Sequence, residues 1–286
     1  MIHVVTYGHA MNRRKFIPLS FAAAAAATLL TQQGSLQTAS AAEEENAKKG
    51  PLKVLMFAGG CCHDYEHQKE ILSAGISERA NIDWEVIHAG GSGHEHRYAK
   101  LLEKDWHVGY DAVVYNICFA REKDEKYIEA ITETHKQGLG AVGIHCTAHS
   151  YHWKVETKAW PQFLGVTSMN HGKKHPITIR KTANEHPVMQ GFPYLWTTPK
   201  GELYNVKKVW PTATVLADGT IDGGEVRQPC VWVNEHGKGR VFSTTVGHHN
   251  ETMMEPLYLD LVARGLLWAS GHLQDDGTPE AGYAAE

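Results

Sequence analysis

The chain has 286 residues, of which 42% are hydrophobic, and its formal net charge at pH 7 is −4. This length suits one large globular domain or two small ones. A mildly acidic chain without a block of basic residues is a poor binder of nucleic acid or of an anionic membrane surface, so we expect neither as a partner.

The chain begins with a segment typical of an export signal. Arg13 and Arg14 precede an alanine-rich apolar run, and residues 39–41 (ASA) offer a small-residue cleavage site. This pattern predicts a twin-arginine signal peptide that starts at Met11. The alternative, a membrane-spanning helix, needs an apolar run of ~20 residues, and this run is shorter. We therefore expect residues 1–41 to be an N-terminal extension and signal, and the mature protein to be periplasmic or secreted.

A solvated leader (42–51), one α/β domain (52–271) and a C-terminal tail (272–286) are expected to follow. In the first half of the domain, apolar runs alternate with amphipathic segments. This alternation is typical of a mostly parallel sheet with helices on both faces. The predicted strands are 52–60, 83–91, 110–118 and 139–146, and the predicted helices are 67–80, 98–106 and 124–138.

The pattern changes after Trp160, where strands predominate. An amphipathic helix at 255–271 closes the domain, and residues 169–175 are expected to be a connecting loop. Neither G-x-G-x-x-G after the first strand nor G-x-x-x-x-G-K-[ST] occurs, so nucleotide binding has no support. The predicted strands are 175–182, 202–209, 212–218 and a pair within 229–248 joined by a Gly-Lys-Gly hairpin.

Histidine is frequent, with 19 in the chain, and many of these residues follow predicted strands. Ligands of open α/β sheets bind at the carboxyl ends of the strands. We therefore expect His145 and His248 to face one cavity that His63 also lines. Five other histidines are expected at ordinary surface positions: His88, His107, His135, His236 and His272.

Cys146 is a candidate nucleophile because it follows a buried strand, where a tight turn would expose its sulfur. His249 and Glu251 could supply a base and its orienting carboxylate, as in a Cys-His-Glu hydrolase of the class I amidotransferase type. Ile144 and Ala148 stand where those enzymes have flanking glycines. An odd number of cysteines without a C-x-x-C pair argues against a disulfide framework. We expect Cys146 to be dispensable for chemistry.

The histidines could instead hold a metal ion or transfer protons. His149 and His152 are three residues apart and would share a helical face. With His145, His171 or His248 they could bind zinc or a related divalent ion, and the trio His145, His149 and His171 is the predicted set. No strong zinc signature such as H-E-x-x-H is present. Acid–base or hydrogen-bonding histidines without a metal therefore remain an alternative.

Two further features have both a functional and a structural explanation. Asp64 opens a predicted helix and could simply cap it, whereas His63 is not explained in that way. Tryptophans near the expected cleft could stack on a sugar ring, although tryptophan is more often a partly buried packing residue. The tryptophans in question are Trp153, Trp160, Trp196, Trp210 and Trp232.

The chain resembles the ThuA-like, or trehalose-utilisation, family over residues 52–270. The resemblance implies a flavodoxin-like sheet related to class I amidotransferases but without their full triad. It also implies a role in sugar catabolism, since members are associated with trehalose use and with enzymes that handle 3-keto-glycosides. The residues that carry the resemblance are HDYEH (63–67), GLGAVGIH (138–145), His171, HPV (186–188), ELY (202–204), GKGRVFSTTVGH (237–248) and GLLWASG (265–271).

The resemblance also implies site residues: His63, His145, His171, Glu202 and His248. Gly201 stands where the family often has an aspartate, so Glu202 would be the carboxylate of the site. We expect an exported protein that acts on an oxidised (3-keto) glycoside or a trehalose-type sugar by histidine and carboxylate acid–base chemistry. A sugar-binding module without catalysis is the alternative. The candidates are His63, Asp64, His145, Glu202 and His248 for catalysis, and Tyr65, His149, His152, Tyr204 and His249 for substrate binding.

Overall fold

The structure is a computed structural model that describes residues 50–221 and 223–285. The expected signal (1–41) and nearly all of the leader (42–51) lie outside these residues. No helix within the described ranges is long and apolar enough to cross a membrane.

A nine-stranded sheet is the centre of the described part, with the order β2-β1-β3-β4-β11-β10-β9-β6-β7. The strands from β2 to β11 in this order pair in parallel, and those from β11 to β7 pair antiparallel. The predicted α/β fold is confirmed. The strands are β1 (Leu52–Gly60), β2 (Ile82–His88), β3 (Ala112–Cys118), β4 (Gly140–Ile144), β6 (Ile177–Lys181), β7 (Leu195–Thr197), β9 (Ala213–Ile221), β10 (Gln228–His236) and β11 (Gly239–Thr244).

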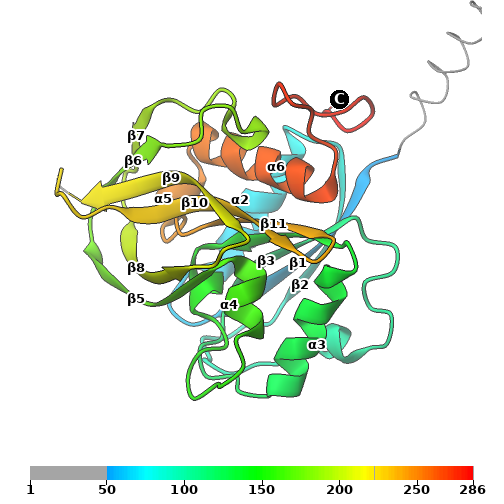
Figure 1. The fold of residues 1–286 in the computed structure, drawn as a ribbon. Helices are drawn as coiled ribbons and strands as arrows, with labels where there is room; N and C mark the ends of the chain where they lie inside the picture. Colours follow the sequence, from blue (N-terminus) through cyan, green and yellow to red (C-terminus); the bar gives the residue numbers. More distant parts are fainter. Residues whose placement is uncertain (1–49, 222, 286) are drawn as a thin grey trace, which may run out of the picture. The chain divides into compact units, whose positions relative to one another are not determined.

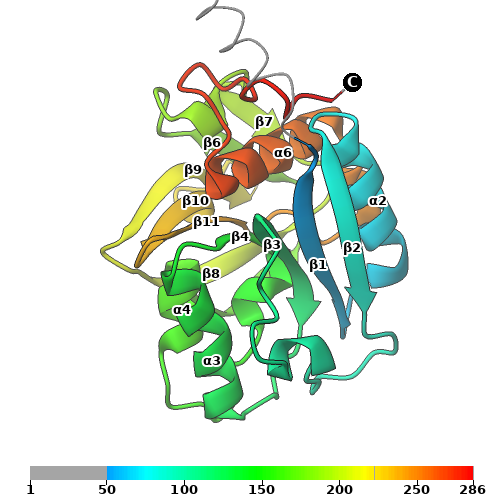
Figure 2. The same cartoon turned by 90° about the vertical axis from the view of Figure 1, so that its right-hand side faces the viewer.

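Helices cover both faces of this sheet (Figure 1). On one face lie α2 (Tyr65–Ser77) and α6 (Pro256–Ser270), and on the other lie α3 (Glu125–Lys136) and α4 (Ala159–Leu164). Figure 2 shows β2 and β1 side by side, with α2 next to them. The start of α2 is fixed by Asp64, whose side chain accepts the backbone N–H of His67 as a helix cap.

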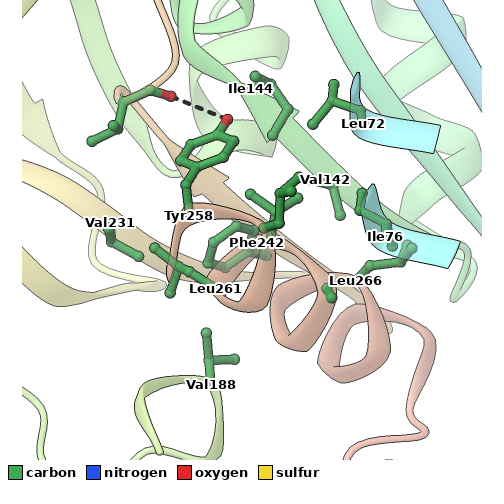
Figure 3. Close-up of a cluster of buried hydrophobic side chains, with 14 of the residues drawn as sticks. Leu72, Ile76, Val142, Ile144, Val188, Val231, Phe242, Tyr258, Leu261 and Leu266 are labelled. Carbon is green, nitrogen blue, oxygen red and sulfur yellow. Dashed lines mark hydrogen bonds between the residues drawn. The ribbon is translucent and has the colours of Figure 1, made fainter. Parts of the chain in front are cut away.

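A hydrophobic core fills the space between the sheet and the pair α2 and α6 (Figure 3). Fully burying an aliphatic or aromatic side chain contributes about 1.5–3 kcal/mol. Tyr258 is buried there as well, and its hydroxyl donates to the carbonyl of Val246 at 3.4 Å. This core anchors the strands whose ends carry the site. Its members include Leu72, Ile76, Val142, Ile144, Phe242, Leu261 and Leu266.

A separate two-stranded sheet pairs β5 (Val166–Lys174) with β8 (Glu202–Val209) in antiparallel register. The prediction that residues 169–175 form a loop is therefore wrong. Their sequence MNHGKKH is polar, and most of its side chains are exposed, so it lacks the apolar alternation of a half-buried strand. Backbone pairing with β8 makes it a strand, in a register that is interrupted by irregularities.

The predicted helix at 98–106 is also wrong, because only a short 3-10 helix, η1 (Ala99–Leu102), forms there. A segment of this length gains few helical hydrogen bonds for the cost of nucleation. The sequence patterns did not indicate α4 or β7. The remaining short elements are η2 (His145–His149), η3 (Pro187–Met189) and α5 (Asn250–Met253).

The C-terminal segment returns to the parallel half of the sheet. Ala284 forms a β-bridge with Ala80, and the backbone N–H of Asn81 donates to the carbonyl of Tyr283 at 3.0 Å. Over its described residues, the expected tail at 272–286 thus contacts the domain just before β2.

Candidate functional site

Three parallel strands end at one edge of the sheet, and each is followed by a histidine. His63 follows β1, His145 follows β4, and His248 follows β11. The ring centroid of His63 lies 4.8 Å from that of His145 and 4.6 Å from that of His248. The centroids of His145 and His248 are 5.3 Å apart. The structure therefore brings together the three histidines that the strand ends suggested.

His145 is held in an unusual backbone conformation. Its φ of 46° is in the left-handed region, which costs a residue other than glycine about 1–3 kcal/mol. The imidazole is fixed by its Nδ1–H, which donates to the carbonyl of Thr245 at 2.5 Å. Strain of this kind persists when the surroundings impose it, and it is concentrated at functional sites.

Glu202, the first residue of β8, supplies a buried carboxylate to the same point. Its Oε2 lies 3.0 Å from Nδ1 of His248 and 3.4 Å from Nε2 of His145. The exposed His171 has its Nε2 3.5 Å from the same oxygen. The hydroxyl of Tyr204, on the same strand, lies 3.1 Å from Nε2 of His145. The two-stranded sheet thus provides an anion and a phenol to a group of imidazoles.

Burial sets the charge state of this group. Burial, together with the neighbouring imidazoles of His145 and His248, lowers the pKa of His63 to about 2. Burial also lowers the pKa of His145, against the opposing effect of Glu202. For Glu202, burial alone would raise the pKa, but hydrogen bonds with His145 and His248 hold it well below its usual range. Near neutral pH the site therefore contains an ionised Glu202 carboxylate beside the uncharged imidazoles of His63 and His145.

A surface cavity of about 610 Å³ gives solvent access to the cluster, and both His63 and His248 line it. His249 lines it too, with its ring centroid 4.3 Å from that of His248. Asp64 lies at the same cavity, but its carboxylate is engaged by Nδ1 of His67 and by Nδ2 of Asn250, each at 2.8 Å. The geometry thus gives Asp64 the capping role that was its structural alternative.

The predicted substrate-binding residues separate into two groups. Tyr65 has its hydroxyl 3.1 Å from Nδ1 of His63, and His149 stacks on Tyr204 with ring centroids 3.9 Å apart, so these side chains surround the cluster. His152 instead lines a second cavity, of about 300 Å³, together with Trp210.

Two groups of potential metal ligands occur among the described residues: His63, His145, Glu202 and His248, and His63 with Cys118 and Cys146. Of the predicted trio His145, His149 and His171, only His145 belongs to either group. Nε2 of His149 instead lies 2.9 Å from the hydroxyl of Ser168, and the side chain of His171 is 38% exposed.

Comparison with protein families gives a match to ThuA, described as trehalose utilisation, over residues 53–269. The chain belongs to the ThuA family. No curated protein matched the sequence.

Solved structures with a similar fold include two ThuA-like proteins. One, from Parabacteroides merdae ATCC 43184, has a TM-score of 0.59 at 20% identity, over 81% of this chain and 97% of that one. The other, from Bacteroides uniformis ATCC 8492, has a TM-score of 0.57 at 16% identity, over 77% and 93%. A β-galactosidase from Rahnella sp. R3 gives 0.51 at 14% identity, over 82% of this chain and 34% of that one. At these identities the likeness concerns the fold.

Gly201 of this ThuA-family chain packs against the side chain of Ile177. A Cβ at this position would lie 2.6 Å from Cδ1 of Ile177, so a side chain there would require the end of the Ile177 side chain to move. Glu202 is the carboxylate that reaches the cluster.

The cysteines of this ThuA-family protein correct one expectation. Disulfides join Cys61 to Cys62 and Cys118 to Cys146, and Cys230 is the free cysteine of the described ranges. The argument against disulfides from number and spacing was wrong, because the ends of β3 and β4 bring Cys118 and Cys146 together. The sulfur of Cys146 is bonded in this structure, so it is not available as a nucleophile.

Two further expectations are corrected by burial. His135 and His236 are not at the surface, since their exposures are 0% and 8%. Of the tryptophans proposed as a sugar platform, Trp160 and Trp232 are buried. Their indole N–H groups donate to backbone carbonyls of Thr147 and Leu164, so they are packing residues.

Gln68 supports the site but was not among the candidates. It is buried on α2, and its Nε2 donates to the backbone carbonyl of His248 at 3.3 Å, while its Oε1 accepts from Asn116. A signal existed in the sequence. Gln68 lies three residues after Tyr65 and four before Leu72, so it is a polar residue on the buried stripe of the helix.

Proposed function

We propose that this ThuA-family protein is an enzyme of carbohydrate catabolism that acts on an oxidised (3-keto) glycoside or a related trehalose-type sugar. The family description, trehalose utilisation, supports the substrate class. The observation that carries the proposal is the convergence of His63, His145, His248 and Glu202 beside a solvent-accessible cavity. Proton transfer by imidazole and carboxylate groups is the chemistry that these residue types perform best.

A keto group at C3 of a sugar makes this chemistry effective. An uncharged imidazole takes the proton from C2, and the electron pair forms an enolate on the keto oxygen. The enolate then expels the glycosidic oxygen from C1, and an acid returns a proton to the leaving alcohol. Glu202, beside His145 and His248, would stabilise the imidazolium that forms on either ring. The hydroxyl of Tyr204 is a donor at the same position.

A sugar-binding module is the alternative from a different class, since the same cavity could hold a sugar without reaction. The Cys-His-Glu hydrolase is disfavoured by two observations. The sulfur of Cys146 is in a disulfide, and the exposed carboxylate of Glu251 pairs with Lys200 at 3.2 Å.

The test is turnover of a 3-keto-disaccharide, followed by chromatography of the released monosaccharide, together with calorimetric binding of the same compound. An enzyme gives product in proportion to its concentration, and the unoxidised disaccharide serves as the control substrate. Saturable binding without product would overturn the proposal in favour of the binding module.

We also propose that the protein is exported by the twin-arginine route, on the basis of Arg13 and Arg14 and residues 39–41. Replacing both arginines by lysine should leave the precursor in the cytoplasm, which cell fractionation and immunoblotting would detect. Normal export of the double variant would contradict the assignment.

A further inference from the structure

Four side chains direct more hydrogen-bond acceptors toward one point than the neighbouring donors can satisfy. They are His63, His145, His248 and Glu202. Nδ1 of His63 lies 3.1 Å from the carbonyl of Cys61, and Nδ1 of His145 lies 2.5 Å from the carbonyl of Thr245. A carbonyl oxygen only accepts, so we assign the proton to Nδ1 in both rings; the hydroxyl of Tyr65, also 3.1 Å from Nδ1 of His63, then accepts from the same N–H. In the uncharged ring, Nε2 then has a free lone pair.

Both Nε2 atoms point to the same neighbour. Nδ1 of His248 lies 2.9 Å from Nε2 of His63, 3.3 Å from Nε2 of His145 and 3.0 Å from Oε2 of Glu202. That single nitrogen has at most one proton for three acceptors. The hydroxyl of Tyr204 can donate to His145, which still leaves His63 and Glu202 competing for one proton. Nε2 of His171, 3.5 Å from Oε2 of Glu202, adds no donor in the uncharged ring, because Nδ1 of His171 donates to the carbonyl of Gly172 at 2.7 Å.

Four of the six separations among these atoms are 2.9–3.4 Å, a spacing that suits a metal ion. A point equidistant from four atoms about 3.2 Å apart lies about 2.0 Å from each, which is the length of a zinc–nitrogen or zinc–oxygen bond. A water oxygen needs about 2.7–3.0 Å to each hydrogen-bond partner. All four atoms lie within 4.8 Å of one another, and the measured pairs are at 2.9–3.4 Å.

The surroundings of the four atoms are also those of a metal site. Histidine ligands usually donate their second ring N–H to a backbone carbonyl or a carboxylate, which fixes the tautomer and orients the ring. His63 and His145 do this through Cys61 and Thr245. The buried Gln68 holds the backbone of His248.

We propose that Nε2 of His63, Nε2 of His145, Nδ1 of His248 and Oε2 of Glu202 bind a divalent first-row transition-metal ion, with zinc as the reference probe. Three imidazoles and one carboxylate are a ligand set that zinc and its neighbours favour. This set differs from the trio predicted from the sequence and shares only His145 with it.

The proposal that the ion binds does not depend on the proposed function. Only a role of the ion in turnover rests on that function. When bound, the ion would act as a Lewis acid toward a keto oxygen. Its ligands would then not be free to transfer protons, and this task would pass to Tyr204 and His171, which contact His145 and Glu202.

The experiment measures the ion directly. The full chain is purified without chelator and its metal content is determined by mass spectrometry. It is then stripped with a chelator and titrated with zinc in a calorimeter. We expect about one ion per chain, and at least about tenfold weaker binding in Glu202→Gln and in His248→Gln, because loss of even an outer partner typically costs about 10–100-fold. His149→Gln, a buried imidazole outside the ligand set, is the matched control and should bind zinc like the parent.

A cobalt spectrum distinguishes this site from the second group, which contains Cys118 and Cys146. The proposed ligand set gives d–d bands without a thiolate charge-transfer band. Circular dichroism verifies that each variant is folded. The proposal is overturned if the stripped parent binds neither zinc, cobalt nor manganese, if a folded Glu202→Gln binds as tightly as the parent, or if the thiolate band appears.

The outcomes for ion and function are separable. Turnover of the keto-disaccharide by protein without bound metal supports the proposed function and shows that turnover does not need the ion. Stoichiometric zinc binding without turnover supports the ion site and rejects the enzyme.

Discussion

Two buried histidines of this protein, His135 and His145, differ in how their ring nitrogens are used. Both are nearly inaccessible, with exposures of 0% and 2%. For His135, Nδ1 donates to the carbonyl of Leu139 and Nε2 faces the hydroxyl of Tyr115, both at 2.9 Å. Each nitrogen therefore has one partner. Nε2 of His145 instead has three polar neighbours.

The comparison shows what burial alone does not reveal. A histidine whose two nitrogens are matched one to one stabilises the fold, as His135 does between α3 and β3. A histidine that shares its partners with other acceptors, as His145 does, has lone pairs left for a substrate proton or an ion. Four predictions test this distinction, in order of decreasing expected effect.

The largest effect is expected for His145→Gln. An amide keeps hydrogen-bonding atoms and a similar volume, but it neither titrates near neutral pH nor replaces an imidazole ligand. Turnover of the keto-disaccharide should fall by about 10²–10⁴ while the melting temperature stays near that of the parent. Near-parental turnover in the variant would make His145 a structural residue like His135.

Cys146→Ala tests whether Cys146, the neighbour of His145, contributes to stability and not to chemistry. The disulfide with Cys118 closes a chain segment with a sequence separation of 28, and loss of such a bond typically costs about 2–4 kcal/mol. Urea unfolding under oxidising conditions should detect this loss, while most activity is retained.

Cys118→Ala is the control for this bond. It should have the same effect on stability, and the double variant should be no less stable than either single one, because all three lack one bond. Complete loss of activity in folded Cys146→Ala would revive the nucleophile hypothesis.

His135→Gln should destabilise the protein without impairing the chemistry. A buried partner that is left unsatisfied costs about 1–3 kcal/mol, and Tyr115 or Leu139 would lose its partner. The midpoint of urea unfolding should fall, and turnover per folded molecule should match the parent. A loss of turnover comparable to that of His145→Gln would contradict the distinction.

The smallest effect concerns pH. Burial lowers the pKa of His135 from its ordinary value of 6.5 to about 3. Between these values the unfolded chain binds a proton that the folded chain does not. The contribution of neutral His135 is thus fully present above about pH 6.5 and is lost as the pH falls toward about 3. The difference in unfolding free energy between the parent and His135→Gln should therefore narrow between pH 7 and pH 4, and a constant or growing difference would contradict the assignment.

The sequence predicted the fold well where hydrophobic runs carry the information. The strand bounds 52–60 and 202–209 match β1 and β8, and the histidines after β1, β4 and β11 meet as the rule for parallel strands implies. Residues 169–175 were mispredicted because a solvent-exposed strand lacks an apolar pattern and depends on its partner, β8.

Other features could not be read from local patterns, because they depend on side chains that are distant in sequence. Whether His135 is buried depends on Tyr115 across the helix–sheet interface. The pairing of Cys118 with Cys146 depends on the adjacency of β3 and β4. His145 and His149 have different partners, because one ring faces Glu202 and the other faces Ser168.

The position of β11 in the sheet has a consequence for folding kinetics. It is the last strand of the described chain, yet it lies between β4 and β10 and joins the parallel half of the sheet to the antiparallel half. His63 and His248 are 185 positions apart, and contacts of such separation form late because the intervening chain must first be ordered. Helical signals should thus recover before the site does during refolding. An ion-binding or activity assay on a refolded sample would count only chains in which residues 239–244 have inserted into the centre of the sheet.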